Sequence, residues 1–373
     1  MIMLRRNHAR HRYQRGLSII ELMVALALSL LLIAGVIQIF VASKMTYNIQ
    51  EGLARVQENG RFALELIKPD IRMAGLRTVC AGEFPPLQVH LNLGNADIAN
   101  IFNISNGTFG WEFQNTGDGQ TYTVSTLNPS GVAFSSWIGG LTAALQNKVI
   151  PGTDVLLVKR IQPIPGLTAQ GNTPANATAL NLNRAHQTAQ DSIILVSDCT
   201  YADLFQNRSA SNANAFSRGV GAGKPPGNIS GNWSTQYDDR MQVYQVMISA
   251  YYIGRGASGE PSLFRLDFGT AGAAPTAADH QELVEGIENM QILYGVGNAS
   301  GITNYVTADN VVDWNAVMSV RVALLARSSE QVQTSIDNRS FALNTTTVKP
   351  IPDRRYRQVF STTIALRNAV EVR

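Results

Sequence analysis

A continuous apolar segment near the amino terminus limits what this chain can fold into more than any other feature. Residues 17–41, LSIIELMVALALSLLLIAGVIQIFV, contain a single ionisable side chain, that of Glu21. As an α-helix these 25 residues would be about 37 Å long, which is enough to cross a hydrocarbon core of about 30 Å. We therefore expect residues 17–41 to span a membrane and the rest of the chain to fold outside it.

The charge distribution predicts the orientation of this segment. Residues 1–16 contain five of the 30 Lys and Arg residues and no Asp or Glu. Because positively charged flanks remain on the cytoplasmic side, we expect a cytoplasmic amino terminus and a body on the other side of the membrane. Without those five Arg the chain has 25 basic and 27 acidic residues. That balance disfavours a broad nucleic-acid-binding surface, which needs clustered Lys and Arg on the folded body.

The apolar segment has three possible roles. A secretory signal would be cut after it, near residues 41–43, but signal apolar regions are typically about 7–15 residues long. A plain membrane anchor fits the length and leaves the position of Glu21 unexplained. The third role is a leader cut before the apolar helix, and residues 15–21, RGLSIIE, favour it. This pattern resembles the class III leader of type IV pilins and of the related type II secretion pseudopilins.

The resemblance implies roles for three residues. Prepilin peptidase would cut after Gly16 and methylate the new amino terminus at Leu17, where the family usually has Phe. Glu21 would neutralise the amine of its own subunit, or accept the amine of a neighbouring subunit and so set the axial register of assembly. A carboxylate in the bilayer costs about 2.5–3.5 kcal/mol at a helix centre and less near a helix end. The alternative for Glu21 is therefore a boundary carboxylate solvated by headgroup water.

Beyond the apolar segment the sequence becomes amphipathic. Residues 42–75 have apolar side chains at spacings of three and four, which indicates a helix with one stripe available for burial against a sheet. We expect one helix from Leu17 to about Lys68, ended or kinked by Pro69. Three glycines are expected weak points at which this helix could bend: Gly35, Gly52 and Gly60.

After residue 75, short apolar runs alternate with Gly, Asn, Ser and Pro, a pattern typical of strands and turns. The expected strands are 154–161, 192–196, 242–253, 290–294, 318–326 and 359–366. Because no helical segments alternate with them, we expect an antiparallel sheet with long loops, packed on the amino-terminal helix. Residues 163–190 and 207–236 are expected to be loops or mobile insertions whose surface is solvated and carries no chemistry.

Further segments resemble those of PilW-type minor pilins. They are ENGRFA (58–63), DIRMAG (70–75), VSDC (196–199), ADLFQ (202–206), NMQILYG (289–295), VRVALLAR (320–327) and VFSTTIALRN (359–368). The resemblance implies a pilin-like α+β fold with four parts. These are a leader (1–16), the transmembrane part (17–41) and the amphipathic part (42–75) of one long helix, and a β-rich periplasmic domain (76–373).

Two cysteines, Cys80 and Cys199, follow the expected membrane span, on the side where disulfides form. A disulfide between them would stabilise the fold by roughly 4–5 kcal/mol through loop-closure entropy and would hold the helix end near the sheet. Two free, buried thiols are the alternative. With no third cysteine and no CxxC spacing, zinc binding and redox catalysis are disfavoured.

The sequence lacks the patterns typical of enzymes. Residues 219–225, GVGAGKP, are similar to a phosphate-binding loop but depart from its pattern at two positions. Arg218 stands where the loop needs its leading Gly, and Pro225 stands where it needs Ser or Thr. His186 and His280 are expected to be solvated, and Asp309 and Asp313 lack the spacing of a calcium loop. We therefore expect no catalytic residue, cofactor or metal.

The resemblance implies a minor pilin that primes type IV pilus assembly and lies at or near the pilus tip. Its expected partners are other minor pilins and the major pilin, through their amino-terminal helices, together with prepilin peptidase, the inner membrane and a tip adhesin. Two other functions remain open. One is a J-type pseudopilin of type II secretion, which the chain length and the carboxyl-terminal motifs disfavour. The other is a membrane-anchored periplasmic hydrolase, which would not be cut at Gly16.

Overall fold

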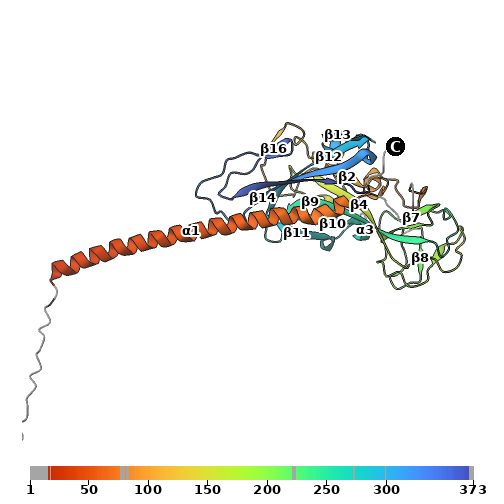
Figure 1. Ribbon diagram of the computed structural model, residues 1–373, viewed down its shortest axis with the longest axis horizontal. Helices are drawn as coiled ribbons and strands as arrows, with labels where there is room; N and C mark the ends of the chain where they lie inside the picture. Colours follow the sequence, from red (N-terminus) through yellow and green to blue (C-terminus); the bar gives the residue numbers. More distant parts are fainter. Residues whose placement is uncertain are drawn as a thin grey trace, which may run out of the picture. The chain divides into compact units, whose positions relative to one another are not determined.

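The computed structural model describes residues 16, 18–75, 80, 84–220, 224–271, 274–298 and 300–368. The chain divides into two compact units, one that ends at Glu51 and one that begins at Gly52. Helix α1 (Ile19–Arg72) begins in the first unit, and the described strands all lie in the second (Figure 1). A long apolar helix followed by a mostly antiparallel β-rich domain confirms the predicted α+β fold.

Local hydrogen bonding explains where α1 begins. The hydroxyl oxygen of Ser18, the residue before the helix, accepts a hydrogen bond from the backbone N–H of Ile20 at 3.3 Å. The Ser18 carbonyl accepts one from the N–H of Leu22 at 3.0 Å. A side-chain oxygen at this position satisfies one of the amides that have no partner within the helix.

The helix ends one turn later than the sequence predicts. Pro69 was expected to end or kink it after Lys68, but the helix continues to Arg72. Pro lacks an N–H and crowds the preceding turn, which weakens the helix locally. Ile71 in this last turn is fully buried, and the free energy of that burial favours the helical form beyond the proline.

The larger sheet contains eight strands among the described residues and centres on β9 (Gln242–Arg255). Its other strands are β1 (Leu87–Val89), β2 (Thr108–Trp111), β4 (Val155–Pro163), β6 (Ile193–Ser197), β7 (Ala202–Gln206), β10 (Pro261–Asp267) and β11 (His280–Glu285). β9 pairs with β6 near its start, with β4 over residues 244–251 and with β10 over residues 249–255. All pairs in this sheet are antiparallel except β1 with β7.

A second, four-stranded sheet is antiparallel throughout, in the order β13-β12-β14-β17. Its strands are β12 (Ile287–Asn298), β13 (Gly301–Val306), β14 (Val317–Arg327) and β17 (Arg357–Ala365). Smaller sheets join β3 (Thr121–Thr123), β15 (Phe341–Leu343) and β16 (Thr346–Lys349), and β5 (Ala179–Asn181) with β8 (Ala215–Ser217). The short helices are α2 (Ala96–Phe102), α3 (Phe268–Ala271), η1 (Phe134–Ser136), η2 (Ala143–Leu145), η3 (Ala277–Asp279), η4 (Ala308–Asn310) and η5 (Trp314–Ala316).

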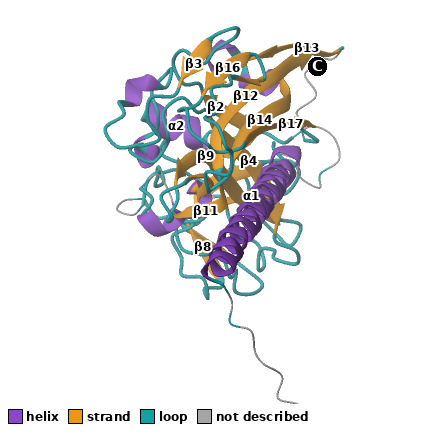
Figure 2. Cartoon of the chain, turned by 90° about the vertical axis from the view of Figure 1, so that its left-hand side faces the viewer, coloured by secondary structure: helices purple, strands orange, loops and turns teal. Residues whose placement is uncertain are grey.

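Each of the six strands predicted from the sequence is present, as β4, β6, β9, β12, β14 and β17. All of them except β6 contribute to the surface on which the second half of α1 packs (Figure 2). The buried stripe of α1 is Gly52, Val56, Gly60, Ala63, Leu64, Ile67 and Ile71. Its apolar members share a core with Val158 of β4, Tyr251 of β9 and Val322 of β14. The amphipathic pattern therefore predicted a buried stripe through Val56, Leu64, Ile67 and Ile71, but it also included Phe62, which is 53% exposed, and missed Ala63.

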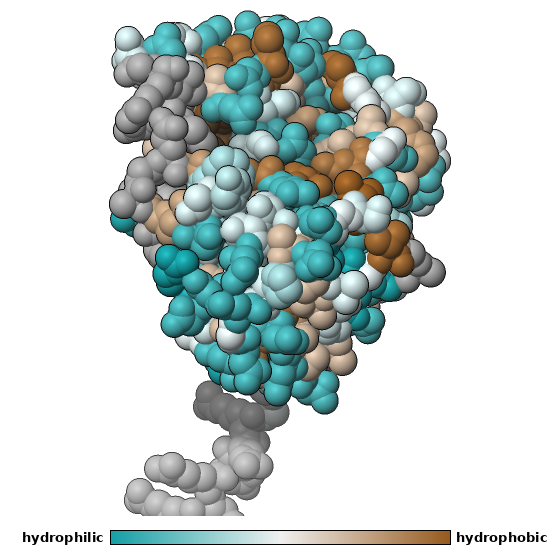
Figure 3. All heavy atoms as spheres, turned by 90° about the vertical axis from the view of Figure 1, so that its right-hand side faces the viewer, coloured by the Kyte–Doolittle hydropathy of each residue, from teal (hydrophilic) through white to brown (hydrophobic). Residues whose placement is uncertain are grey.

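The prediction of solvated loops at 163–190 and 207–236 is wrong in part. These segments contain β5 and β8, and they enclose a separate core with Phe216, Trp233 and Tyr237, each at most 2% exposed. Asn, Ser and Gly dominate the composition, and the few aromatic residues show no period that would reveal a core. Hydrophilic residues still cover much of the face shown in Figure 3, with hydrophobic residues gathered mainly in its upper half.

Candidate functional site

The amino-terminal site predicted from the sequence lies at the start of α1. Gly16 is exposed and precedes the helix, and Glu21 is exposed in its first turn. Leu17 lies outside the described residues. Among the described residues, none forms a hydrogen bond or an ion pair with the side chain of Glu21. A negative charge near a helix amino terminus interacts favourably with the helix dipole, by about 0.3–1 kcal/mol at an exposed site, and leaves the carboxylate oxygens available to another molecule.

Apolar side chains follow Glu21 along the first unit. Helix α1 contains an apolar stretch of 18 residues and is long enough to cross a membrane. None of the residues in this stretch is buried within the chain. Leu30, Leu31 and Leu32, for example, are 67–72% exposed. Exposed apolar surface of this extent marks a contact with lipid or with other proteins. The methylation motif and this helix are consistent with membrane anchoring.

Two glycines in the second half of α1 allow close packing. A Cβ added to Gly60 would lie 2.3 Å from the ring of Phe360 in β17. A Cβ added to Gly52 would lie 3.0 Å from a methyl group of Val332. Both positions were predicted to be weak points of the helix. The structure assigns them a different role, because the absence of a side chain lets the body approach the helix backbone.

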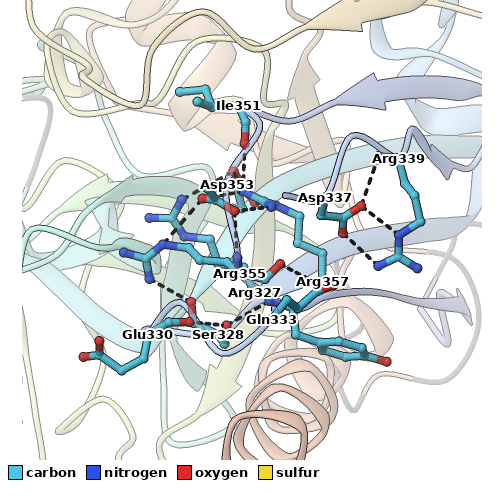
Figure 4. A network of polar contacts seen from close by, with 12 residues as sticks. Arg327, Ser328, Glu330, Gln333, Asp337, Arg339, Ile351, Asp353, Arg355 and Arg357 are labelled. Atoms are coloured by element: carbon cyan, nitrogen blue, oxygen red, sulfur yellow. Dashed lines mark hydrogen bonds and ion pairs between the residues drawn. The ribbon is translucent and has the colours of Figure 1, made fainter. Parts of the chain in front are cut away.

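A network of polar contacts fixes the loop that carries Val332 (Figure 4). Arg355 donates from Nη1 to the Ser328 carbonyl at 2.8 Å, and Gln333 donates from Nε2 to the Arg355 carbonyl at 2.8 Å. Arg357 is fully buried and pairs with Glu288 (Nε to Oε2, 2.6 Å) and with Asp353 (Nη1 to Oδ1, 2.7 Å). The ion pairs compensate the cost of burying the Arg357 charge. The hydrogen bonds of Arg355 and Gln333 hold the loop that carries Val332 in position against α1.

Polar groups hold the carboxyl-terminal end of α1. Asp70 accepts hydrogen bonds from Arg160 Nε at 3.0 Å and from the Tyr251 hydroxyl at 2.7 Å. Burial raises the pKa of Tyr251 above its ordinary value, and the neighbouring Asp70 charge raises it further. The Asn59 amide donates to the Glu285 carbonyl at 3.0 Å. The second half of α1 is therefore fastened to β4, β9 and β11 by specific bonds as well as by apolar packing.

A disulfide joins Cys80 and Cys199, whose Cα atoms are 5.4 Å apart and whose sequence separation is 119. Cys80 lies shortly after the end of α1, and Cys199 lies in the turn between β6 and β7. Cys199 has a positive φ of 70°, which is uncommon for a residue with a side chain. The bond therefore attaches the segment after α1 to the edge region of the larger sheet.

The histidines were predicted to be solvated, and this prediction is wrong. His186 is 1% exposed and stacks on Phe216 with ring centroids 4.7 Å apart. His280 is half-buried, with Nδ1 2.7 Å from the Tyr252 hydroxyl. The aromatic residue that each histidine contacts is distant from it in sequence. The polar residues next to each histidine in sequence therefore did not predict the contacts with Phe216 and Tyr252.

A cluster around Asp203 contains Ser, His and Asp but lacks the arrangement of a catalytic triad. His90 Nε2 lies 2.6 Å from Asp203 Oδ1, and Ser234 donates its hydroxyl to Asp203, not to His90. The other ring nitrogen of His90 faces Arg218 Nη1 at 3.4 Å. A nucleophile must lie within reach of its base, so these side chains form a structural network. Burial favours a raised pKa for Asp203, but the hydrogen bonds from His90, Ser234 and Tyr237 lower it below its usual range.

Comparison with known families supports a pilin. The model of the family described as Type IV Pilus-assembly protein W (PilW) matches residues 250–368. That region runs from the middle of β9 through β17 and includes the three carboxyl-terminal segments that carry the resemblance. The segments at 58–75 and 196–206 lie outside the match, so their similarity to PilW stays a prediction.

A second family model, the prokaryotic N-terminal methylation motif, matches residues 11–37. No curated protein and no solved structure matches the chain. Both matching families point to a structural protein without catalytic activity. The two matches, at opposite ends of the chain, support a type IV pilus-related pilin that is similar to the PilW family over residues 250–368 and to the N-terminal methylation motif over residues 11–37.

Proposed function

We propose that this protein is a minor pilin, made as a prepilin and cut by prepilin peptidase between Gly16 and Leu17. The observation that carries the proposal is the arrangement of α1. Its first half exposes apolar side chains with Glu21 in the first turn, whereas its second half is fastened to the body. A helix of this kind can associate laterally with other helices while it presents a fixed globular domain.

In this proposal the amine of Leu17 is methylated, and Glu21 accepts the amine of a neighbouring subunit. The pair would neutralise two charges that are costly in an apolar environment. Other minor pilins and the major pilin supply the neighbouring helices. The assembled complex primes the pilus, lies at or near its tip and supports a tip adhesin there, with the body on the periplasmic side of the inner membrane before assembly.

Amino-terminal sequencing tests the proposal. The protein is purified from membranes of cells with and without prepilin peptidase. We expect a chain that begins at methylated Leu17 in the first case and an intact leader in the second. A start near Lys44, or an intact leader in cells with active peptidase, would show that the segment is a secretory signal or a plain anchor.

A further inference from the structure

A groove lies on the face of the four-stranded sheet that points away from the second half of α1. Side chains alternate between the two faces of a strand, and Val320 and Val322 of β14 belong to the core shared with α1. Arg321 lies between them and therefore points to the opposite face. The register pairs Arg321 with Thr363 of β17, and Ser361 shares the face of Thr363. These three polar residues line the groove, which has a volume of about 500 Å³.

The turn between β15 and β16 forms the other wall of the groove. Leu343 of β15 shares a small core with Ala323 of β14, which covers the neighbouring part of the same sheet face. The cover ends at Asn344, which lines the groove. The Asn344 amide nitrogen donates to the carbonyl oxygens of Gln291 at 2.9 Å and of Arg321 at 3.4 Å. Because the nitrogen is used in these bonds, the side chain offers a ligand its oxygen, an acceptor.

The guanidinium group of Arg321 is held in one orientation. Its Nε donates to Thr363 Oγ1 at 3.1 Å, and its Cζ lies 4.0 Å from the centroid of the Tyr305 ring of β13. A Cβ added to Gly295 of β12 would lie 3.0 Å from this ring, so the glycine leaves room for the ring to lie across the sheet. The Ser319 hydroxyl donates to the Tyr305 hydroxyl at 3.1 Å. The ring and the hydroxyl groups therefore orient the cation before any ligand arrives.

The charge of Arg321 is not neutralised by the described part of the chain. No described carboxylate forms an ion pair with the half-buried Arg321 side chain, and its two Nη nitrogens donate no hydrogen bond there. Arg327 of the same strand, in contrast, pairs with Glu260 and Glu288. A guanidinium group presents its donors in a planar fork that matches the two oxygens of a carboxylate. The groove therefore contains a pre-oriented cation that is suited to an anion from outside.

The rest of the lining favours a hydroxylated ligand. Thr363 accepts the bond from Arg321, so its own hydroxyl hydrogen stays available to donate. Ser361 is exposed and adds a second hydroxyl group. The apolar members of the described lining are Ala342 and Val359, which are small. Peptide-binding sites usually depend on larger apolar anchors, so this lining suits a polar small molecule better than a protein segment.

We propose that the groove binds a carboxylate that carries hydroxyl groups, the chemistry of an acidic sugar such as galacturonate. The carboxylate accepts hydrogen bonds from the Nη nitrogens of Arg321 and from the Thr363 hydroxyl. Hydroxyl groups of the ligand bond to Ser361 and to the Asn344 oxygen. The site lies wholly in the globular unit, and its occupancy does not depend on the pilin function proposed above.

Titration of the full chain in detergent with galacturonate, followed by ligand-observed NMR, tests the proposal. We expect saturable binding with a Kd of about 1 mM, as for a small polar ligand held by a few hydrogen bonds. Galactose has the ring hydroxyls without the carboxylate and should bind at least about tenfold more weakly. A blocked tripeptide with a central glutamate has the carboxylate without the hydroxyls and should bind at least about threefold more weakly.

Variants of the protein assign the binding to Arg321. Arg321→Gln should weaken galacturonate binding by at least about tenfold. Arg321→Lys keeps the charge but loses the planar fork, so it should also bind more weakly than the unaltered protein. Arg354→Gln removes an exposed charge elsewhere on the same unit and should leave the Kd unchanged. Circular dichroism checks that each variant is folded.

The proposal is overturned if the unaltered protein shows no saturable binding of galacturonate up to about 20 mM. It is also overturned if galactose binds as tightly as galacturonate, a comparison that needs no variant, or if folded Arg321→Gln binds as the unaltered protein does. Tighter binding of the tripeptide than of galacturonate would overturn it as well, because the groove would then be a contact for an acidic protein segment.

Discussion

Gly60 and Phe360 are 300 residues apart in sequence, yet a Cβ on Gly60 would lie 2.3 Å from two ring atoms of Phe360. The aromatic ring of β17 therefore packs directly on the backbone of α1. This contact, with that of Gly52 and Val332, sets how closely the helix approaches the body.

Replacement of Gly60 by Ala should therefore destabilise the globular unit. Ala favours a helix interior by about 1 kcal/mol over Gly, but a methyl group forced into a packed site typically costs about 1–3 kcal/mol. We expect a lower urea midpoint for Gly60→Ala, followed by tryptophan fluorescence of the full chain in detergent. Gly35→Ala is the matched control, because nothing lies within 4 Å of a Cβ at that position. Equal midpoints for the two variants would contradict the packing role.

Asp70→Asn should destabilise the attachment of the helix end. The substitution removes the charge that pairs with Arg160, whose side chain is 23% exposed, and weakens the bond from Tyr251. Hydrogen bonds to charged groups typically contribute about 1.5–3 kcal/mol, and we expect a loss of about 1–2 kcal/mol in the free energy of unfolding. Glu65→Gln breaks an ion pair to Lys68 on the same helix, where the side chains are 67% and 41% exposed. That loss should stay below about 0.5 kcal/mol.

Removal of the disulfide should destabilise the protein without a large change in fold. The bond closes a loop with a sequence separation of 119, for which loop-closure entropy gives about 4–5 kcal/mol. Cys199→Ser should lower the free energy of unfolding by up to this amount and expose Cys80 to a thiol-specific label. In the unaltered protein neither cysteine should react until a reductant is added. Labelling of both thiols without reductant would show that the bond is absent in the cell.

Stability should decrease as the pH rises through the neutral range. The folded protein holds a proton on Glu112 up to about pH 10, whereas the unfolded chain releases it near its ordinary value of 4.5. Between these values the folded state binds more protons than the unfolded state, so the free energy of unfolding falls as the pH rises. Urea unfolding between about pH 5 and pH 8 should show this decline.

Glu112→Gln is neutral throughout this range and should make the decline smaller, and the decline that remains is expected from Asp154, whose pKa burial raises to about 8. Asp239→Asn changes an exposed carboxylate elsewhere on the same unit and should keep the full decline. A pH dependence that is unchanged in Glu112→Gln would assign the effect to other groups.

Glu21→Gln should reduce incorporation into pili while membrane insertion continues. The substitution keeps the size of the side chain but removes the negative charge available to a neighbouring amine. We expect the variant to accumulate in the inner membrane in cleaved form, as measured by fractionation and immunoblotting of sheared pili. Glu58→Gln changes an exposed carboxylate on the same helix and should be incorporated normally. Normal incorporation of Glu21→Gln would support the boundary-carboxylate alternative.

Much of the fold could be predicted from the sequence because the relevant signals are local. The spacing of Val56, Leu64, Ile67 and Ile71 gives most of the buried face of α1 directly. The strands are runs of Val, Ile, Leu and Tyr, and they were found within a few residues of their bounds. Gly16 and Glu21 were selected because residues 15–21 resemble a prepilin leader, and the structure leaves their assigned roles as proposals.

The remainder depends on contacts between residues distant in sequence. The low helix propensity of Gly predicts a flexible point at Gly60. The packing of Gly60 on Phe360 could not be predicted, because Phe360 is distant in sequence. Glu112 follows a short strand and resembles any surface carboxylate, until the fold buries it beside Asp154. His186 likewise becomes buried only through Phe216. In each case the local pattern gives the residue type and the tertiary structure gives its environment.

The Cys80–Cys199 bond also determines how the protein responds to mechanical force. A subunit held in a filament by its amino-terminal helix and pulled through its body carries tension along the polypeptide. Tension that leaves α1 reaches Cys80 and passes through the covalent bond to Cys199, at the turn between β6 and β7. The residues between the two cysteines, which include α2, β2, β4 and Glu112, lie outside this covalent path, although β4 also contacts α1 through Arg160 and Asp70. They can keep their structure under a pull that would otherwise extend them first.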